Sequence, residues 1–349
     1  MAGKNLMILV FICVFGVGMA DKLVPAIITF GDSSVDVGNN DYLATAFRAD
    51  YAPYGRDFKN KLATGRFSNG KLATDITADT LGFEKPSPPY LSPEATGKNL
   101  LDGANFASAG SGFDDKTAMA SNVITLTMQV EYFKEYQSKL AAYAGSKKAA
   151  SIISGALYIV SFGNSDFMQN YYLNPLLQKM YSPDEYSSYL IRIYSNLIQE
   201  LYGLGARRIG VTSLPPIGCV PAAITLFGYG SNSCVQSLNN VALKFNKKMN
   251  LSTTKISKQY PKLKIAIFDI YKPLLDIVHN PSKSGFVEAR KGCCGSGLVE
   301  TTTALCNPKT PGTCANATQY VFWDAAHPTE AANQILADSL LLEGITLVL

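Results

Sequence analysis

The sequence predicts an α/β protein: a three-layer α/β/α sandwich around a mostly parallel, flavodoxin-like doubly wound sheet. Apolar runs that suit burial on both faces recur along the chain, which is typical of parallel strands. Amphipathic stretches of helical period lie between them, and this alternation places helices on both faces of one sheet. Of the 349 residues, 47% are hydrophobic and 17% are charged, so the chain can bury a large core.

The first twenty residues are predicted to form a signal peptide that is removed. Lys4 gives a positive start, residues 6–17 are almost wholly apolar, and residues 18–20 offer small side chains for cleavage before Asp21. An uncleaved membrane anchor is the alternative, but the apolar stretch is shorter than the ~20 residues that a span needs. Residues 21–349 contain no linker-like run, so we expect a single domain, secreted to the extracellular space or cell wall.

Four continuous apolar runs are predicted to be the buried strands. They are residues 24–30, 156–162, 208–214 and 263–269. Each run ends at or beside a Gly, Pro or Asp, which is typical of a strand that passes into a turn. In folds of this class the functional groups lie just beyond the carboxyl ends of the strands.

Helices and loops are predicted between these strands. Helical periodicity marks residues 69–81, 183–204 and 234–259. Residues 51–67 and 85–97 are rich in Pro, Gly and polar side chains, and are expected to be long surface loops that could shape a pocket.

The C-terminal run, residues 340–349, is apolar but short, and it contains the charged Glu343. It lacks the polar spacer of a lipid-anchor signal. We expect it to be the end of a packed helix followed by a buried tail, and we expect no integral membrane span after removal of the signal peptide.

The cysteine pattern predicts disulfides. Of 7 cysteines, Cys13 lies in the predicted signal peptide, which leaves six, an even number that is typical of exported proteins. Adjacent Cys293 and Cys294 can hardly bridge each other without strain. We therefore expect Cys219 to pair with Cys234, and the last four cysteines to pair among themselves. A metal site is the alternative for those four: Cys293, Cys294, Cys306 and Cys314. It is disfavoured because they lack CxxC spacing.

The charge distribution indicates whether the chain binds nucleic acid, and its sequons indicate where it could be glycosylated. The net charge is +4, and Lys and Arg are scattered without a basic stripe, so nucleic acid is not an expected partner. Asn250 and Asn316 each begin an Asn-x-Ser/Thr sequon and are candidate glycosylation sites.

A candidate nucleophile follows the first predicted strand. Phe30-Gly31-Asp32-Ser33 places a serine where the glycine allows a sharp turn that exposes the hydroxyl at the edge of the sheet. Turns are rich in these residues, so an ordinary turn is the alternative. The chain lacks the Gly-x-Ser-x-Gly elbow of α/β-hydrolases, and that fold is not expected.

The base is sought among only two histidines. His279 lies near the end of a helical stretch, where a cation complements the helix dipole, and is interpreted as structural or solvent-exposed. His327 lies in a loop before a helix that Thr329 could cap. Asp324, three residues earlier, could accept the imidazole N–H and fix its tautomer. A satisfied loop pair or half of a metal site are the alternatives, but no other histidine is near, so neither metal nor cofactor is expected.

Together with further blocks, these motifs show a family resemblance. The chain resembles the plant-type GDSL esterase/lipases of the SGNH hydrolase superfamily, with the blocks in that family's order and approximate spacing. The resemblance covers nearly the whole mature chain. The matching blocks are Phe30–Ser33, residues 65–70, 103–112, 163–167 and 214–219, and Asp324-x-x-His327-Pro328.

The resemblance implies a role for each site residue. Ser33 would be the nucleophile, His327 the base and then the acid, and Asp324 its orienting partner. The oxyanion hole would comprise the backbone N–H groups of Ser33 and Gly110 and a side chain from the third block. The implied activity is hydrolysis of a small-molecule, lipid or polymer ester through an acyl-enzyme. Acyl transfer to an alcohol, or a binding protein without activity on the same fold, are the alternatives.

The third block departs from the family pattern of Gly-x-Asn-Asp. Gly163 and Asp166 match, but Ser165 occupies the asparagine position and Asn164 stands one place earlier. Because side chains alternate at the end of a strand, a shift by one position reverses the direction of a side chain. We therefore expect Ser165 at the site, with Asn164 as the second choice.

Three aromatic residues near these blocks could line an acyl pocket: Phe106, Phe113 and Phe162. Core packing is the simpler explanation, because aromatic side chains are commonly buried. A histidine base also predicts that activity falls in acid, since an unperturbed imidazole takes up a proton at about pH 6.5.

Overall fold

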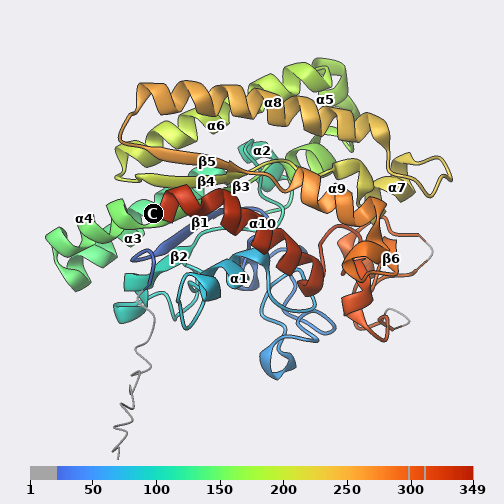
Figure 1. The fold of residues 1–349 in the computed structure, drawn as a ribbon, viewed down its shortest axis with the longest axis horizontal. Coiled ribbons are helices and arrows are strands. Elements are labelled where there is room, and N and C mark those ends of the chain that lie inside the picture. Colours follow the sequence, from blue (N-terminus) through green and yellow to red (C-terminus); the bar gives the residue numbers. More distant parts are fainter. Residues whose placement is uncertain (1–21, 298, 310–311, 349) are drawn as a thin grey trace, which may run out of the picture.

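The computed structural model describes residues 22–297, 299–309 and 312–348. The predicted signal peptide, residues 1–20, lies outside the described residues. A central sheet of five parallel strands has the order β2-β1-β3-β4-β5. This is the flavodoxin-like order, and it confirms the predicted fold class (Figure 1). The strands are β1 (Ile27–Gly31), β2 (Gly103–Asn105), β3 (Leu157–Ser161), β4 (Arg208–Thr212) and β5 (Lys264–Phe268).

All four predicted strands are present, each shorter than its apolar run. The fifth strand, β2, spans only three residues at the edge of the sheet, too few for a periodicity to reveal. A second, two-stranded parallel sheet pairs β6 (Glu288–Gly292) with β7 (Tyr320–Phe322), close to the C-terminal helix. Strand β6 carries charged side chains, and β7 spans only three residues, so neither resembles the long apolar runs of the central sheet.

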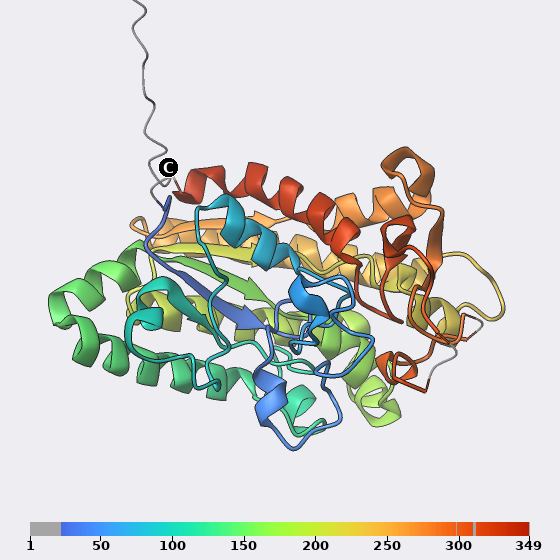
Figure 2. The same cartoon turned by 90° about the horizontal axis from the view of Figure 1, so that it is seen from below.

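Helices cover both faces of the central sheet (Figures 1 and 2). Aromatic and aliphatic side chains from one face pack against three long helices, and this contact forms the largest part of the core. The helices of this layer, with α4 beside α3, are α3 (Leu126–Ala144), α4 (Ser146–Gly155), α6 (Pro183–Gly203) and α8 (Gln236–Gln259). Two helices in contact with each other cover the other face, α1 (Ala73–Thr80) and α10 (Glu330–Val348). The shorter helices are α2 (Asp115–Met119), α5 (Pro175–Met180), α7 (Pro221–Phe227) and α9 (Tyr271–His279).

Helix α10 begins as predicted, because the Thr329 hydroxyl accepts a hydrogen bond from the backbone N–H of Ala332. It differs from the prediction at its other end, where the helix continues through Val348 and leaves no separate buried tail. The run of apolar, helix-compatible side chains after residue 340 explains this continuation. Among the described residues, α10 alone is long and apolar enough to cross a membrane by length and composition. Here it packs on α1 and β5.

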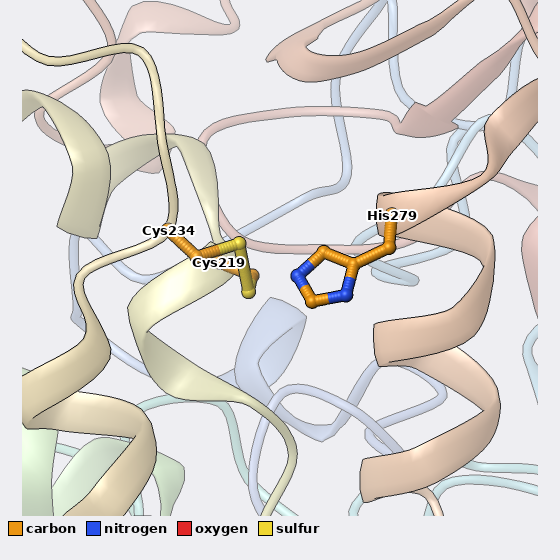
Figure 3. A group of neighbouring side chains, drawn as sticks. All are labelled: Cys219, Cys234 and His279. Atoms are coloured by element: carbon orange, nitrogen blue, oxygen red, sulfur yellow. A yellow bond between two sulfur atoms is a disulfide. The ribbon is translucent and has the colours of Figure 1, made fainter.

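Three disulfides pair the six cysteines as the sequence predicted. The bonds join Cys219 to Cys234, Cys293 to Cys314 and Cys294 to Cys306. His279 is exposed at the end of α9, in accord with its interpretation, and its ring faces the first of these bonds (Figure 3). The two sulfurs there are bonded to each other, so neither is the thiolate that a metal ion requires.

The two sequon asparagines are both exposed, Asn250 within α8 and Asn316 in a turn before β7. Exposure is necessary for glycosylation but does not establish it. Modification at these sites stays a prediction.

Candidate active site

Ser33, His327 and Asp324 meet at the carboxyl end of β1. The Ser33 Oγ lies 2.7 Å from the Nε2 of His327, although the two residues are 294 positions apart in the chain. The Nδ1 of His327 lies 2.9 Å from each carboxylate oxygen of Asp324. A proton on Nδ1 therefore faces the carboxylate, which leaves Nε2 free to accept the proton of the serine hydroxyl. The structure brings all three predicted residues together.

Asp324 is fully buried and receives four donors. Its Oδ1 accepts hydrogen bonds from the backbone N–H groups of Ala326 and His327, at 2.9 and 2.8 Å. Its Oδ2 accepts one from the Tyr54 hydroxyl at 2.8 Å. Burial, and then the charge of Asp324, raise the pKa of Tyr54 well above its ordinary value, so the phenol keeps its proton and remains a donor.

Tyr54 was not predicted from the sequence. It lies in the loop expected at residues 51–67, and only the fold brings that loop to Asp324. The same loop supplies Phe67, whose ring packs against the His327 imidazole with centroids 4.9 Å apart. The expectation that this loop shapes the site is met by Phe67, which lines the cavity described below, whereas no residue of the predicted loop 85–97 does.

The Gly31 backbone, two residues before the candidate nucleophile Ser33, is held by hydrogen bonds from the buried side chain of Gln129 on α3. The Gly31 N–H donates to Gln129 Oε1 at 3.0 Å, and Gln129 Nε2 donates to the Gly31 carbonyl at 2.9 Å. The same Nε2 donates to the Ser111 hydroxyl at 3.2 Å. A Cβ at Gly31 would lie 2.6 Å from the Ser161 carbonyl oxygen, so this close approach requires glycine. Gln129 thereby links the strand end to the segment that carries Gly110.

Gly110 belongs to a segment that follows β2 and continues its pairing with β1. The Ser108 N–H donates to the Gly31 carbonyl, and the next N–H, of Ala109, donates to the Asp36 carboxylate. Gly110 itself has a φ of +85°, the left-handed region that favours glycine. These contacts place Gly110 close to the end of β1.

Asp32 directly precedes the candidate nucleophile Ser33 and is also buried. Its carboxylate accepts a hydrogen bond from the Ser34 N–H at 3.0 Å. Burial raises its pKa to about 6, and the hydrogen bonds with Ser34 and the charge of His327 oppose that rise. The carboxyl therefore shapes the turn that presents Ser33.

The third block differs from the sequence-based expectation. Gly163 turns the chain with a φ of +115°, and Ser165 has helical φ and ψ, so strand alternation does not extend past β3. Asn164 lines the cavity next to Ser33 and His327. Ser165 does not line it: the residue is 1% exposed, and its hydroxyl has no hydrogen-bond partner among the described residues. The second choice, Asn164, is the one that reaches the cavity.

Asp166, which ends this block, binds the segment after Gly110. Its carboxylate accepts hydrogen bonds from the N–H groups of Phe113 and Asp114 and from the Thr117 hydroxyl, at 2.7 to 3.1 Å. Burial raises the pKa of Asp166 to about 7, although these hydrogen bonds oppose the rise. The carboxyl fixes the backbone downstream of Gly110 rather than facing the cavity.

A cavity opens at these residues. Its volume is about 110 Å³, and its lining includes Ser33, Asn164 and His327. The three aromatic residues considered from the sequence are buried in the core instead, where two of them pack with ring centroids 5.2 Å apart. Core packing was therefore the correct explanation for them: Phe106, Phe113 and Phe162.

Comparisons with known proteins identify the family of this chain. The family model for GDSL-like lipase/acylhydrolase proteins matches residues 27–340. The GDSL esterase/lipase APG of Arabidopsis thaliana is 66% identical over 327 residues, which cover 94% of this chain and 93% of that protein. Another GDSL esterase/lipase of the same plant is 55% identical, over 95% of this chain and 94% of its own.

Solved structures with a similar chain path include Axe2, an acetylxylan esterase from Geobacillus stearothermophilus. It has a TM-score of 0.43 and 13% identity, over 92% of this chain and 95% of that one. The family model and the Arabidopsis relatives span nearly the whole described chain. The chain therefore belongs to the GDSL lipase/acylhydrolase family, as a carboxylic ester hydrolase of the plant type.

Proposed function

We propose that this protein is a secreted serine esterase or lipase in which Ser33, His327 and Asp324 form the catalytic triad. The observation that carries the proposal is the continuous path of contacts, 2.7 Å from Ser33 to His327 and 2.9 Å from His327 to Asp324. The three disulfides support export, because such bonds persist in oxidising compartments.

In the first half-reaction, the Ser33 Oγ attacks the ester carbonyl carbon while Nε2 of His327 takes its proton. Asp324 stabilises the resulting imidazolium through Nδ1. The imidazolium then returns the proton to the ester oxygen of the leaving alcohol, the C–O bond breaks, and an acyl-Ser33 ester remains. A water molecule repeats the sequence: His327 takes its proton, the acid is released and Ser33 is restored.

The negative oxygen of the tetrahedral intermediate needs donors. The N–H groups of Ser33 and Gly110 and the side-chain amide of Asn164 are proposed for this task. Asn164 is favoured over Ser165 because it lines the cavity at Ser33. Removing one such donor typically slows an enzyme by about 10² to 10³-fold.

Labelling with a fluorophosphonate tests the nucleophile. We expect the native protein to be labelled on the peptide that contains Ser33, and Ser33→Ala to remain unlabelled with an unchanged circular dichroism spectrum. Ser138→Ala is the matched control, because Ser138 lies exposed on α3 and should label like the native protein. Absence of labelling in the native protein, where a known esterase reacts, would overturn the proposal in favour of a binding protein.

Product analysis then distinguishes hydrolysis from acyl transfer, which share the acyl-enzyme. Purified protein is given one ester together with an excess of short alcohols, and the products are separated. We expect the free acid to predominate over the transesterified product. Predominance of the new ester would identify an acyltransferase.

A further inference from the structure

The cavity at Ser33 extends far behind the site. It includes Ser161 and Leu157, which lie at opposite ends of β3, and so it follows the strand for roughly 13 Å at about 3.3 Å per residue. Its inner end is lined by Leu81, which directly follows α1, and by Val348 of α10. The lining residues therefore define a channel between the sheet and α1 and α10. Figure 2 shows these two helices over this face of the sheet.

The lining of this channel changes from polar to apolar with depth. Polar side chains gather at the Ser33 end, where the Thr212 hydroxyl donates to the Ser161 hydroxyl at 2.9 Å. Farther in, Ile159, Phe268 and Leu340 contribute apolar surface. Among the described residues that line it, none is an Asp, Glu, Lys or Arg. A sugar or a charged group would lose its hydration there without gaining partners.

Two further polar side chains in the lining are already satisfied by the backbone. The Thr77 hydroxyl donates to the Ala73 carbonyl at 2.8 Å, and the Asn333 amide donates to the Lys71 carbonyl at 3.0 Å. The Thr77 hydroxyl and one N–H of the Asn333 amide are thereby satisfied, whereas the Thr74 hydroxyl in the same lining has no partner among the described residues. Most of the inner lining is nevertheless apolar, which suits an apolar ligand.

The size and position of the channel point to a ligand. At about 110 Å³ it exceeds several-fold the roughly 10–15 Å³ that one enclosed water needs. Apolar cavities without an occupant destabilise a fold, so most cores leave few voids of this size. The channel opens at Ser33, the proposed nucleophile. In an ester attacked by Ser33, the acyl chain is attached to the carbonyl carbon that the serine oxygen contacts, so the chain can extend into the channel.

We propose that the channel between β3, α1 and α10 binds the acyl chain of the substrate, and that the substrate is an ester of an unbranched medium- or long-chain fatty acid. The proposal rests on the proposed function, because it requires Ser33 to be the nucleophile. The leaving alcohol then lies on the solvent side of Ser33, outside the channel. The apolar lining along the length of β3 favours a linear acyl chain over a sugar acid.

A chain-length series tests the occupant. The native enzyme is assayed with p-nitrophenyl acetate, butyrate, octanoate, dodecanoate and palmitate, each below its micelle concentration. We expect kcat/KM to rise by about fourfold for each methylene buried, until the channel is full. A flat profile, or one that falls from acetate onward, would overturn the acyl-channel proposal.

Closing the channel sharpens the test. Gly344 of α10 lines it, and a Cβ there would meet only the Phe268 ring, at 3.2 to 3.3 Å. Gly344→Leu should reduce kcat/KM for dodecanoate at least tenfold and leave acetate hydrolysis within twofold. The matched control is Gly203→Leu at the end of α6, where a Cβ meets nothing within 4 Å. It should leave the whole series unchanged.

A second variant acts in the opposite direction and guards against misfolding of the first. Leu341→Ala widens the channel, and should move the preferred acyl chain to a longer one. If acetate is hydrolysed but both variants leave the chain-length profile unchanged, the channel is a packing void only and the esterase proposal stands. If no ester is hydrolysed and Ser33 is not labelled, the proposed function itself fails.

Discussion

The two halves of the candidate site are held in place by different kinds of interaction. Ser33 extends from a central strand, and its surroundings are fixed by buried amides and carboxylates. His327 follows a segment with little regular structure, fixed by disulfides. The Ser33 Oγ and the His327 Nε2 lie 2.7 Å apart. Noncovalent contacts thus position the serine, and covalent cross-links help to position the histidine.

On the nucleophile side, the part of the site around Ser33, buried side-chain amides bond to the backbone near the end of the short strand β2. The Asn39 amide donates to the carbonyls of Asn105 and Ala107, at 2.8 Å each, and the Asn105 amide donates to the Val35 carbonyl at 2.7 Å. Buried polar groups that are fully satisfied define one arrangement, because any shift leaves them unpaired. This network ties the Ser33 turn to the Gly110 segment.

On the base side, the main chain around residues 293–327 is cross-linked. Cys293 and Cys294 bond to two separate partners, and their N–H groups donate to the carbonyls of Phe322 and Trp323. The Trp323 N–H in turn donates to the His327 carbonyl at 2.7 Å. The position of Ser33 therefore depends on polar contacts in the interior of the fold, whereas the segment that carries His327 is held in part by disulfides, which persist in oxidising surroundings.

The largest effect is expected on the nucleophile side. Asn164→Ala removes the proposed side-chain donor and should lower kcat by about 10² to 10³-fold, with little change in stability, because the residue is only partly buried. Ser165→Ala is the matched control and should lower kcat by less than about tenfold, since its hydroxyl makes no hydrogen bond to the described residues. Steady-state kinetics with one ester decides between them, and the reverse order would restore Ser165 as the donor.

The next effect concerns the cross-linked side. Replacing Cys294 and Cys306 together by serine should lower the free energy of unfolding by about 3 kcal/mol, the typical contribution of a disulfide that closes a loop of this length. Activity per folded molecule should fall with it, because Cys294 is bonded through its N–H to the segment that leads to His327.

Urea denaturation and active-site titration measure the two quantities for that variant. The double serine variant of Cys219 and Cys234 is the control, since this pair lies outside residues 293–327. It should lose comparable stability and retain more activity per folded molecule. Equal activity losses in both variants would show that the base side has no special dependence on its cross-links.

A smaller effect is expected where the two halves meet. Tyr54→Phe removes one of the donors to Asp324, and a hydrogen bond to a charged group contributes about 1.5–3 kcal/mol, so kcat should fall roughly tenfold or more while KM stays nearly constant. Tyr51→Phe, on the ring that packs against Tyr54, is the matched control. If Tyr54→Phe changes KM and thermal stability but not kcat, its role is structural.

A pH dependence of stability is expected at Asp166, on the Ser33 side of the site. The pKa of Asp166 is about 7 in the folded chain against an ordinary 3.8, so the folded state holds the proton more tightly. Its contribution to stability is fully present below the ordinary pKa and is lost as the pH rises through about 7. The stability advantage of the native protein over Asp166→Asn should therefore shrink with rising pH, by at most about 1.4 kcal/mol per pH unit. Urea denaturation at several pH values measures it, and an advantage that grows would contradict the raised pKa.

Prediction from the sequence succeeded where one residue type is rare or one pattern is long. The four main strands could be predicted because each forms an apolar run. The candidate base could be chosen by elimination because the chain has only two histidines. The three-residue strand β2 has no such pattern. Gln129 and Tyr54 look like ordinary helix and loop residues, because their partners are 98 and 270 positions away.

The third block shows a different limit. Strand alternation placed Ser165 at the site, but Gly163 ends the extended conformation before the alternation can apply. Local geometry at a strand end depends on one glycine dihedral, which the sequence permits but does not specify.

The covering of the channel by α10 has a practical consequence for recombinant work. The last described turns of the protein lie over the inner end of the channel, so a purification tag fused after this helix would begin beside Val348. If the channel binds the acyl chain as proposed, a tag there would change the preferred chain length without contacting Ser33 or His327. Enzyme intended for substrate profiling should therefore carry its tag elsewhere, or have it cleaved before assay.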